Sequence, residues 1–216
     1  VLKAGWCLGR IHQLFPDTAF VSAAGLLIED VWQNGYDHTY GGPYKDYNRV
    51  TGEMQLWGLP DPAKAWWQME QAIVGGLELY DITQEDVYLR MADESMEFYM
   101  RHFVDHTFGE VYADRTHTGG IAWNEAKASG GKAGYHAIET GFYSYIYGSF
   151  FYTRQPVTLH YQFQSAAMDR EIKVTPLAIA DDRLGIVDVQ HAGMPYTSYG
   201  SSERVLSIPA GTGGHF

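Results

Sequence analysis

Helix-length segments alternate with two kinds of connection in the first two-thirds of the sequence. Apolar residues recur at three- and four-residue steps in these segments, which is the periodicity of an amphipathic helix. Some connections are short turns, whereas others are long stretches rich in Gly, Tyr and Asp. This alternation predicts helix pairs of an α/α toroid, with the long loops gathered over one end. The predicted helices are 1–15, 17–34, one opened by Asp61-Pro62, 84–104 and 135–153.

The two long connections, 36–57 and 108–131, are each predicted to contain a hairpin. In the second, the run Gly-Glu-Val-Tyr-Ala-Asp marks its beginning. Loops that are held by a rigid scaffold are where binding and catalytic residues usually lie. A functional site is therefore expected in these two loops and at the helix ends beside them.

The pattern changes after Pro156. Apolar and polar residues alternate in four short runs, which is typical of strands. The runs are 157–163, 171–175, 184–189 and 204–209. The sequence thus predicts a mainly α chain, with residues 1–156 forming part of a helical barrel and residues 157–216 a small antiparallel β appendage. The chain opens without Met inside a helical pattern, so we expect further residues to precede Val1.

The composition argues against several classes of partner. The 216 residues carry a net charge of −11 and no Lys/Arg run, which disfavours nucleic acids and anionic membranes. No apolar run approaches the roughly 20 residues that span a bilayer. Cys7 is the single cysteine, so an internal disulfide framework is excluded. The nine histidines are scattered, and neither a metal site nor a cofactor is predicted.

A glycine-rich stretch, Gly130-Gly131-Lys132-Ala133-Gly134, leads directly to Tyr135 and His136. It is predicted to deliver His136 to the first turn of a helix, where backbone N–H groups and the helix dipole hold an imidazole neutral. A neutral imidazole can take a proton from carbon and return one, which is the chemistry of an epimerase or isomerase. Glu139, one turn later, is placed to orient this ring or to raise its pKa.

Three blocks of sequence resemble the N-acylglucosamine 2-epimerase family, which includes cellobiose 2-epimerases and mannose-type aldose–ketose isomerases. They are Trp66-x-Gln68-x-Glu70, His102-Phe-Val-Asp-x-x-x-Gly-Glu110-Val-Tyr112 and Lys132-x-x-Tyr135-His136, in family order within residues 1–153. The resemblance implies an (α/α)6 barrel with the sugar at its centre. It also implies two histidines that exchange the C2 proton of an open-chain aldose. His136 matches one of them, and the other would directly precede Val1.

Two charges depart from the family pattern. Lys3 stands where the family usually has Glu, and Glu139 stands where it usually has Arg. One interpretation is that the exchange preserves an ion pair across the cavity. It would still alter how substrate oxygens are held, because the planar fork of Arg and the point charge of Lys are not interchangeable.

Glu70 is predicted to share a helix face with Trp66 and Ile73. A carboxylate among apolar neighbours is costly unless it is paired. Glu70 is therefore expected either to line a polar cavity or to pair with a cation such as Lys64 or Lys132.

The other candidates each have a functional and a packing interpretation. Trp66 suits stacking on a sugar as well as a core position, and Trp67 is expected in the core. His102 and His106 are expected to be structural, and Trp123 is a candidate roof over the site. The substrate-binding candidates are Lys3, Trp66, Gln68, Glu70, Glu110, Lys132, Tyr135 and Glu139.

The leading hypothesis is sugar epimerisation or aldose–ketose isomerisation at C2, with His136 as the catalytic acid–base. A second is a polysaccharide lyase or glycoside hydrolase that uses Glu70 and Glu110 as a carboxylate pair. A third is a non-catalytic sugar-binding relative. The expected partner is a small sugar or oligosaccharide, a homodimer through the β appendage remains open, and a cytoplasmic location is expected.

Overall fold

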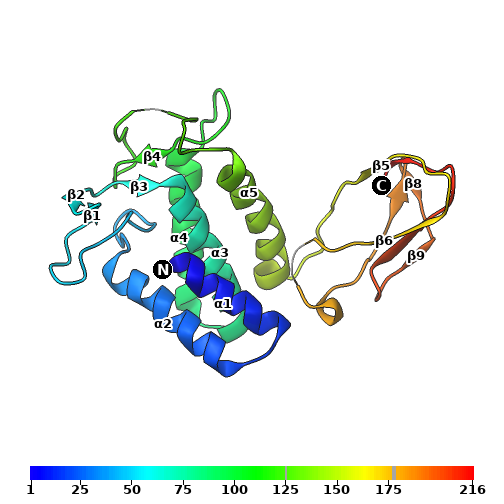
Figure 1. The fold of residues 1–216 in the computed structure, drawn as a ribbon, viewed down its shortest axis with the longest axis horizontal. Coiled ribbons are helices and arrows are strands. Elements are labelled where there is room, and N and C mark those ends of the chain that lie inside the picture. Colours follow the sequence, from blue (N-terminus) through cyan, green and yellow to red (C-terminus); the bar gives the residue numbers. More distant parts are fainter. Residues whose placement is uncertain (125, 177–178) are drawn as a thin grey trace. The chain divides into compact units, whose positions relative to one another are not determined.

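A computed structural model describes residues 1–124, 126–176 and 179–216, which form two compact units, Val1–Arg154 and Gln155–Phe216 (Figure 1). The first unit is helical. Its α4 and α5 each continue into a π-helical segment, η1 and η2. The elements are α1 (Leu2–Leu14), α2 (Thr18–Asn34), α3 (Trp66–Thr83), α4 (Asp86–Phe98), η1 (Tyr99–Phe103), α5 (Tyr135–Tyr147) and η2 (Gly148–Thr153).

The helix boundaries follow local signals in most cases. The Asp17 side chain caps α2 by accepting a hydrogen bond from the Ala19 N–H at 2.8 Å, and Gly35 ends that helix, as predicted. The predicted start of the third helix is wrong. Asp61 instead accepts a hydrogen bond from the Ala63 N–H within a turn, and α3 begins only after Ala65.

Helix α3 is the centre of the helical unit and packs against α1, α4 and α5. It is buried around most of its circumference, as expected of a helix that is apolar on nearly every side. One core cluster joins it to α1, α2 and α4. The cluster contains Leu2, Ala24, Ile28, Val31, Tyr36, Ala72, Leu79, Tyr88 and Met91.

The close approach of α3 and α4 depends on Gly76. A Cβ at this position would lie 2.5 Å from the Tyr88 carbonyl oxygen and 2.9 Å from the Ala92 Cβ. We expect Gly76→Ala to lower the free energy of unfolding by about 1–3 kcal/mol through overpacking, despite the better helix propensity of Ala. Urea denaturation measures the change.

Gly141 is the matched control for this prediction. It lies exposed in α5, and a Cβ there would have no neighbour within 4 Å. Gly141→Ala should leave stability unchanged or raise it by up to about 1 kcal/mol. Equal effects of the two substitutions would show that the packing of α3 on α4 is not the cause.

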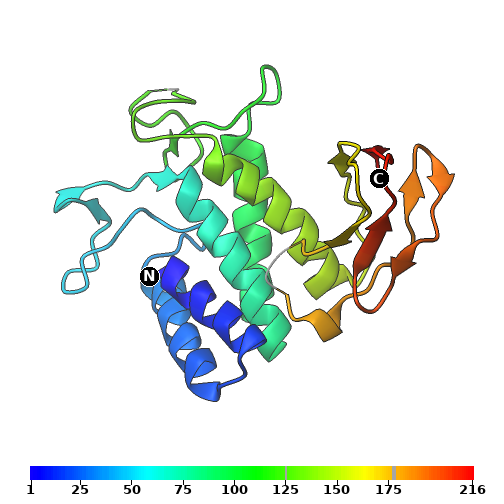
Figure 2. The same ribbon diagram turned by 45° about the vertical axis from the view of Figure 1, so that its right-hand side comes forward.

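The long connections gather over the end of the unit where α3 and α5 begin, as predicted (Figures 1 and 2). The first holds the hairpin β1 (Gln55–Leu56) and β2 (Leu59–Pro60). The second connection also folds back on itself, through antiparallel bridges between Val104 and Val111 and between Arg115 and Ile121. Its two-residue strand pairs outside the loop. β4 (Asp114–Arg115) pairs antiparallel with β3 (Lys64–Ala65), which precedes α3 in the chain, so the two long loops are joined to each other.

The second unit is built from short strands. A three-stranded antiparallel sheet has the order β6-β10-β9, and two further pairs are β11-β5 and β7-β8. Of the predicted strands, 184–189 is wrong, because a strand is absent from that range, which the structure describes in full. The elements are β5 (Gln162–Phe163), β6 (Arg170–Lys173), η3 (Asp181–Arg183), β7 (Gln190–His191), β8 (Met194–Pro195), β9 (Tyr199–Gly200), β10 (Val205–Ile208) and β11 (Gly214–His215).

Among the described residues, none of the helices combines the length and the apolar composition that crossing a bilayer requires.

Candidate active site

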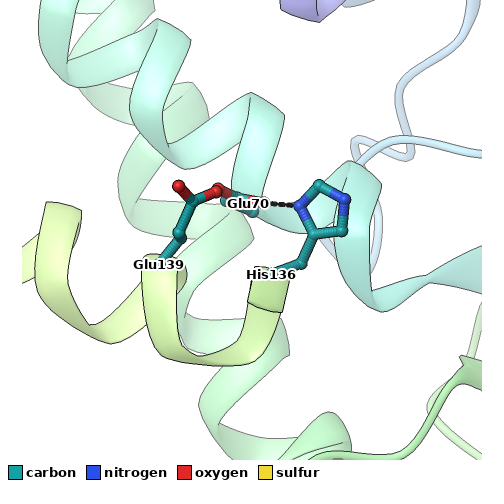
Figure 3. Close-up of side chains that lie close together, drawn as sticks. All are labelled: Glu70, His136 and Glu139. Carbon is teal, nitrogen blue, oxygen red and sulfur yellow. Dashed lines mark hydrogen bonds and ion pairs between the residues drawn. The ribbon is translucent and has the colours of Figure 1, made fainter. Parts of the chain in front are cut away.

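His136 lies in the first turn of α5, after Gly134 at the N-cap position, as the glycine-rich approach predicts. Its Nδ1 is hydrogen bonded to Oε2 of Glu70, which projects from the first turns of α3 (Figure 3). The Glu70 side chain is buried at 1% exposure, and the Gln71 amide also donates to its Oε2 at 3.1 Å. The imidazole is 22% exposed, so the ring is partly accessible.

The surroundings set the protonation of this pair. Burial lowers the pKa of His136, and the charge of Lys3 acts in the same direction, against a smaller opposing effect of Glu139. The neutral imidazole that the sequence predicts therefore has burial as its largest cause. Burial and the neighbouring Glu139 raise the pKa of Glu70 to about 8. Both shifts favour the uncharged form of each group at neutral pH.

Glu139 lies beside Glu70 on the same side of α5 as His136 (Figure 3). The Tyr143 hydroxyl donates to its Oε1 at 3.4 Å, and its hydrogen bond with the Tyr135 hydroxyl is the largest cause that raises the pKa of Tyr135 to about 12. Lys3 is exposed at the start of α1. It forms no ion pair with Glu139 in the described part of the chain, but its charge acts on both Glu70 and His136.

The two lysines considered as partners of Glu70 pair elsewhere. Lys132 Nζ donates to Glu110 Oε2 at 2.8 Å and to the Lys127 carbonyl at 2.7 Å, and it is 5.7 Å from the centre of the Trp66 ring. The structure therefore supports neither lysine as the partner of Glu70, which instead contacts His136, Gln71 and Glu139. Lys132 is buried, although a lysine beside two glycines could equally have been a solvated side chain.

Two indoles flank the imidazole. The ring centres of Trp66 and Trp67 lie 6.2 and 6.4 Å from that of His136. Trp66 is buried, whereas Trp67 is 39% exposed, so the expected core position of Trp67 is wrong. Gln68 points away from the imidazole, because its amide donates to the Lys45 carbonyl.

A cation site was not predicted, yet three potential ligands come together in space. One ligand atom each of Glu70, His136 and Glu139 lies within 4.8 Å of the others. Because Glu70 and His136 are hydrogen bonded directly to each other, we interpret the cluster as an acid–base group. His102 and His106 take no part: the first packs on Phe98, and the second bonds the Met100 carbonyl at 2.7 Å.

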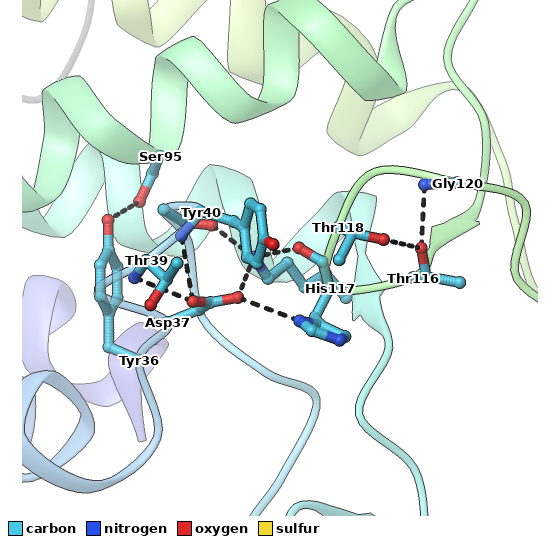
Figure 4. Close-up of polar contacts among 11 residues, drawn as sticks. Tyr36, Asp37, Thr39, Tyr40, Ser95, Thr116, His117, Thr118 and Gly120 are labelled. Carbon is cyan, nitrogen blue, oxygen red and sulfur yellow. Dashed lines mark hydrogen bonds and ion pairs between the residues drawn. The ribbon is translucent and has the colours of Figure 1, made fainter.

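The sequence does not predict a second polar cluster that the structure contains. Lys64 is fully buried, and its Nζ donates to Asp37 Oδ2 at 2.9 Å and to the carbonyl oxygens of Gly41 at 2.6 Å and His117 at 3.1 Å. The His117 ring approaches the same carboxylate, with Nδ1 at 3.7 Å (Figure 4). The acceptors are 27, 23 and 53 residues from Lys64 in sequence, two in the first long loop and one in the second, so no spacing pattern signals this cluster.

Comparison with known proteins supports the resemblance to sugar epimerases and isomerases. The chain is 24% identical over 123 residues to a D-mannose isomerase of Marinomonas mediterranea, a match that covers 57% of the chain and 29% of that protein. The chain therefore spans less than a third of the curated relative it matches. No family model matches the chain.

Solved structures share the fold. A crystal structure of D-mannose isomerase superimposes with a TM-score of 0.57 at 22% identity, covering 64% of this chain and 34% of that one. The cellobiose 2-epimerase of Bacillus thermoamylovorans gives 0.53 at 13% identity, covering 70% and 38%. A family 76 glycoside hydrolase (mannosidase) of Bacteroides thetaiotaomicron gives 0.55 at 15% identity, covering 68% and 37%. At these identities the likeness shows the fold alone.

Proposed function

We propose that the helical unit is part of an α/α toroid enzyme that epimerises or isomerises a sugar by moving the proton at C2. One observation carries this proposal: a half-buried imidazole at the start of α5 is hydrogen bonded to the buried carboxyl group of Glu70. The names of the D-mannose isomerase and cellobiose 2-epimerase relatives support the same class of reaction.

The pairing suits His136 to acid–base catalysis. In the form that acts as a base, Glu70 is ionised and accepts the Nδ1 proton, which leaves the lone pair of Nε2 free to take a proton from carbon. The positive charge that then forms on the ring is stabilised by Glu70, which holds the Nδ1 proton. Isomerisation is completed when the protonated His136 returns the proton to C1 of the enediol, which restores the neutral imidazole. Epimerisation instead needs a second acid that delivers a proton to C2 from the opposite face, with His136 losing its proton to solvent.

The neighbouring groups suit a sugar substrate. Trp66 and Trp67 offer flat apolar faces beside the imidazole, and such faces pack against the C–H groups of a sugar ring. Glu110 and Lys132 form a hydrogen-bonded pair next to Trp66. When a sugar binds, the two side chains could hydrogen bond to its hydroxyl groups instead of to each other. Tyr135, Glu139 and Lys3 complete the proposed rim.

Deuterium incorporation tests the reaction. The full-length protein, incubated with D-mannose or cellobiose in D2O and EDTA, should place deuterium at C2 of the sugar, because the mechanism requires no metal. Absence of deuterium at C2 with both sugars, in protein shown to be folded, would contradict the proposed chemistry. Mass spectrometry and proton NMR report the exchange.

The pH profile should respond in opposite directions to two substitutions. His136 must be neutral to act as a base, and its lowered pKa keeps it neutral below the ordinary value of about 6.5. Glu139 raises the pKa of His136 and Lys3 lowers it. We therefore expect Glu139→Gln to move the acid limb of kcat/KM to lower pH and Lys3→Gln to move it to higher pH. Shifts in the same direction would contradict this assignment.

A glycoside hydrolase is the second candidate, and the likeness in fold to family 76 enzymes favours it. Its two carboxylates would be Glu70 and Glu110. Both are already engaged, Glu70 with His136 and Glu110 with Lys132. This candidate would be supported if the protein releases new reducing ends from a mannan but does not exchange the C2 proton of a sugar.

A further inference from the structure

A buried amide connects α1 to the Glu70–His136 pair. It belongs to Gln71, which follows Glu70 on α3 and is 2% exposed. Its Oε1 accepts a hydrogen bond from the indole N–H of Trp6 on α1 at 2.6 Å. Its Nε2 donates to Glu70 Oε2 at 3.1 Å, and the same oxygen is hydrogen bonded to His136 Nδ1. A continuous series of hydrogen bonds thus runs from α1 through α3 to the imidazole on α5.

The first of these hydrogen bonds fixes the direction of the next. An indole N–H can only donate, so the oxygen of the Gln71 amide must face Trp6. The NH2 group then faces Glu70, and it too can only donate. Turning the amide over would bring two donors together and leave a buried N–H without an acceptor, which is costly. Glu70 Oε2 is therefore held as an acceptor.

The hydrogen bond from Gln71 favours the ionised form of Glu70, because a charged carboxylate is the stronger acceptor. Burial, which is the largest effect, and Glu139 raise the pKa of Glu70, whereas the hydrogen bond from Gln71 and the charge of Lys3 lower it. An ionised Glu70 accepts the Nδ1 proton of His136 and leaves Nε2 with a lone pair. The titratable groups around Glu70 are Lys3 on α1, Tyr99 in η1, and Tyr135, His136, Glu139 and Tyr143 on α5.

Trp6 is fixed by its own surroundings. It is 8% exposed, the guanidinium carbon of Arg10 lies 4.6 Å from the centre of its ring, and the ring of Tyr143 lies at 6.5 Å. A packed indole presents its N–H in one direction, so the Gln71 amide cannot rotate without losing this hydrogen bond. Trp6 thereby acts on Glu70 through Gln71.

We propose that Trp6 and Gln71 are positioning residues: the indole fixes the amide, and the amide holds Glu70 as the acceptor of the Nδ1 proton, which keeps Nε2 of His136 as the base. Their effect on catalysis rests on the proposed function. Their effect on the tautomer of the imidazole does not, because it follows from the hydrogen bonds alone. The sequence does not predict this arrangement, since Trp6 and Gln71 are 65 residues apart.

Gln71→Met tests the amide, because Met is of similar size but cannot donate. In the full-length protein, the acid limb of kcat/KM for C2 proton exchange should move about 0.5–1 pH unit higher, since Glu70 then stays protonated to higher pH. The value of kcat should fall about tenfold, the effect of one hydrogen bond, with little change in KM. In ¹⁵N NMR of histidine-labelled protein, the Nδ1–H tautomer of His136 should be less populated. The signals of His136 are identified by their loss in His136→Gln.

Trp6→Phe removes the indole N–H and keeps an aromatic ring. It should shift the acid limb in the same direction by a smaller amount, and cause no further shift in the Gln71→Met background. Gln13→Met is the matched control, because the Gln13 amide also donates from α1 to a carboxylate on α3, Asp81 Oδ2, at 2.9 Å. That contact lies at the other end of the two helices, so the pH profile and the tautomer of His136 should not change.

The proposal would be overturned by an unchanged pH profile and tautomer in Gln71→Met, by an equal shift in Gln13→Met, or by additive shifts of Trp6→Phe and Gln71→Met. Circular dichroism checks that each variant folds. If Gln71→Met does not fold, the presence or absence of a shift in Trp6→Phe decides. Absence of C2 exchange in protein whose tautomer responds as expected would contradict only the proposed function.

Discussion

His136→Gln in the full-length protein is expected to lower kcat for C2 proton exchange by about 10²–10⁴-fold, because a positioned acid–base group contributes a factor of this size. Gln preserves a hydrogen bond to Glu70 but has no group that accepts a proton from carbon. The substrate contacts of the indoles and of Glu110 remain, so KM should change much less than kcat. Rates of deuterium incorporation over a range of sugar concentrations measure both constants.

His106→Gln is the control for this substitution. His106 is exposed, and its Nε2 bonds the Met100 carbonyl away from Glu70. Its exchange rate should match that of the unmodified protein. If His136→Gln leaves the exchange rate unchanged while the protein remains folded, His136 is not the catalytic base. An equal loss in both variants would indicate damage to the fold instead.

Glu70→Gln separates catalysis from positioning. It leaves a side chain of the same size but removes the carboxylate that stabilises the protonated ring. We expect a smaller loss of kcat than for His136→Gln, accompanied by a change in the pH profile. A change in KM alone would assign Glu70 to substrate binding.

The sequence predicts those parts of the fold that depend on neighbours along the chain. The periodicity of α1 and α2, the cap at Asp17 and the delivery of His136 to the first turn of α5 are all local, and the structure confirms them. The start of α3 was mispredicted, because Asp61 and Pro62 suit a turn as well as a helix cap. Only the pairing of β3 with β4 decides between these alternatives.

The candidate site depends on contacts between segments that are distant in sequence, and the sequence predicts few of these contacts. Family blocks place Glu70 and His136 in one region, but they do not show that the two side chains are hydrogen bonded. The sequence suggests Glu70 as the carboxylate partner of Lys64 or Lys132. In the structure, Lys64 pairs with Asp37 and Lys132 pairs with Glu110. Two-residue strands are also too short for alternation to reveal them, which explains the missed β3 and β4.

The Asp37–Lys64 pair is the feature whose loss should cost the helical unit most. Burial alone would raise the pKa of Asp37, but the hydrogen bond from Lys64 and the backbone N–H groups of Tyr40 and Thr39 lower it instead. The carboxylate is therefore charged at neutral pH inside the protein. Lys64 Nζ also lies 3.9 Å from the centre of the Phe98 ring, at the end of α4.

Lys64→Met should lower the free energy of unfolding by about 3–5 kcal/mol, the usual cost of leaving one member of a buried ion pair without its partner. The carbonyl oxygens of Gly41 and His117 lose their donor as well, so both long loops lose a shared anchor. Urea denaturation of the full-length protein measures the loss. Adding Asp37→Asn to Lys64→Met should recover part of it, because the second substitution removes the unpaired charge.

Arg101→Met tests whether burial is the reason for this effect. Arg101 Nη2 lies 2.7 Å from Glu97 Oε1, a distance as short as that of the Lys64 pair, but both side chains are about two-thirds exposed. An exposed pair four residues apart in a helical segment contributes only about 0.3–0.5 kcal/mol. Similar losses for Arg101→Met and Lys64→Met would mean that the buried anchor contributes no more than a surface contact, and that the loops over α3 and α5 are held by other interactions.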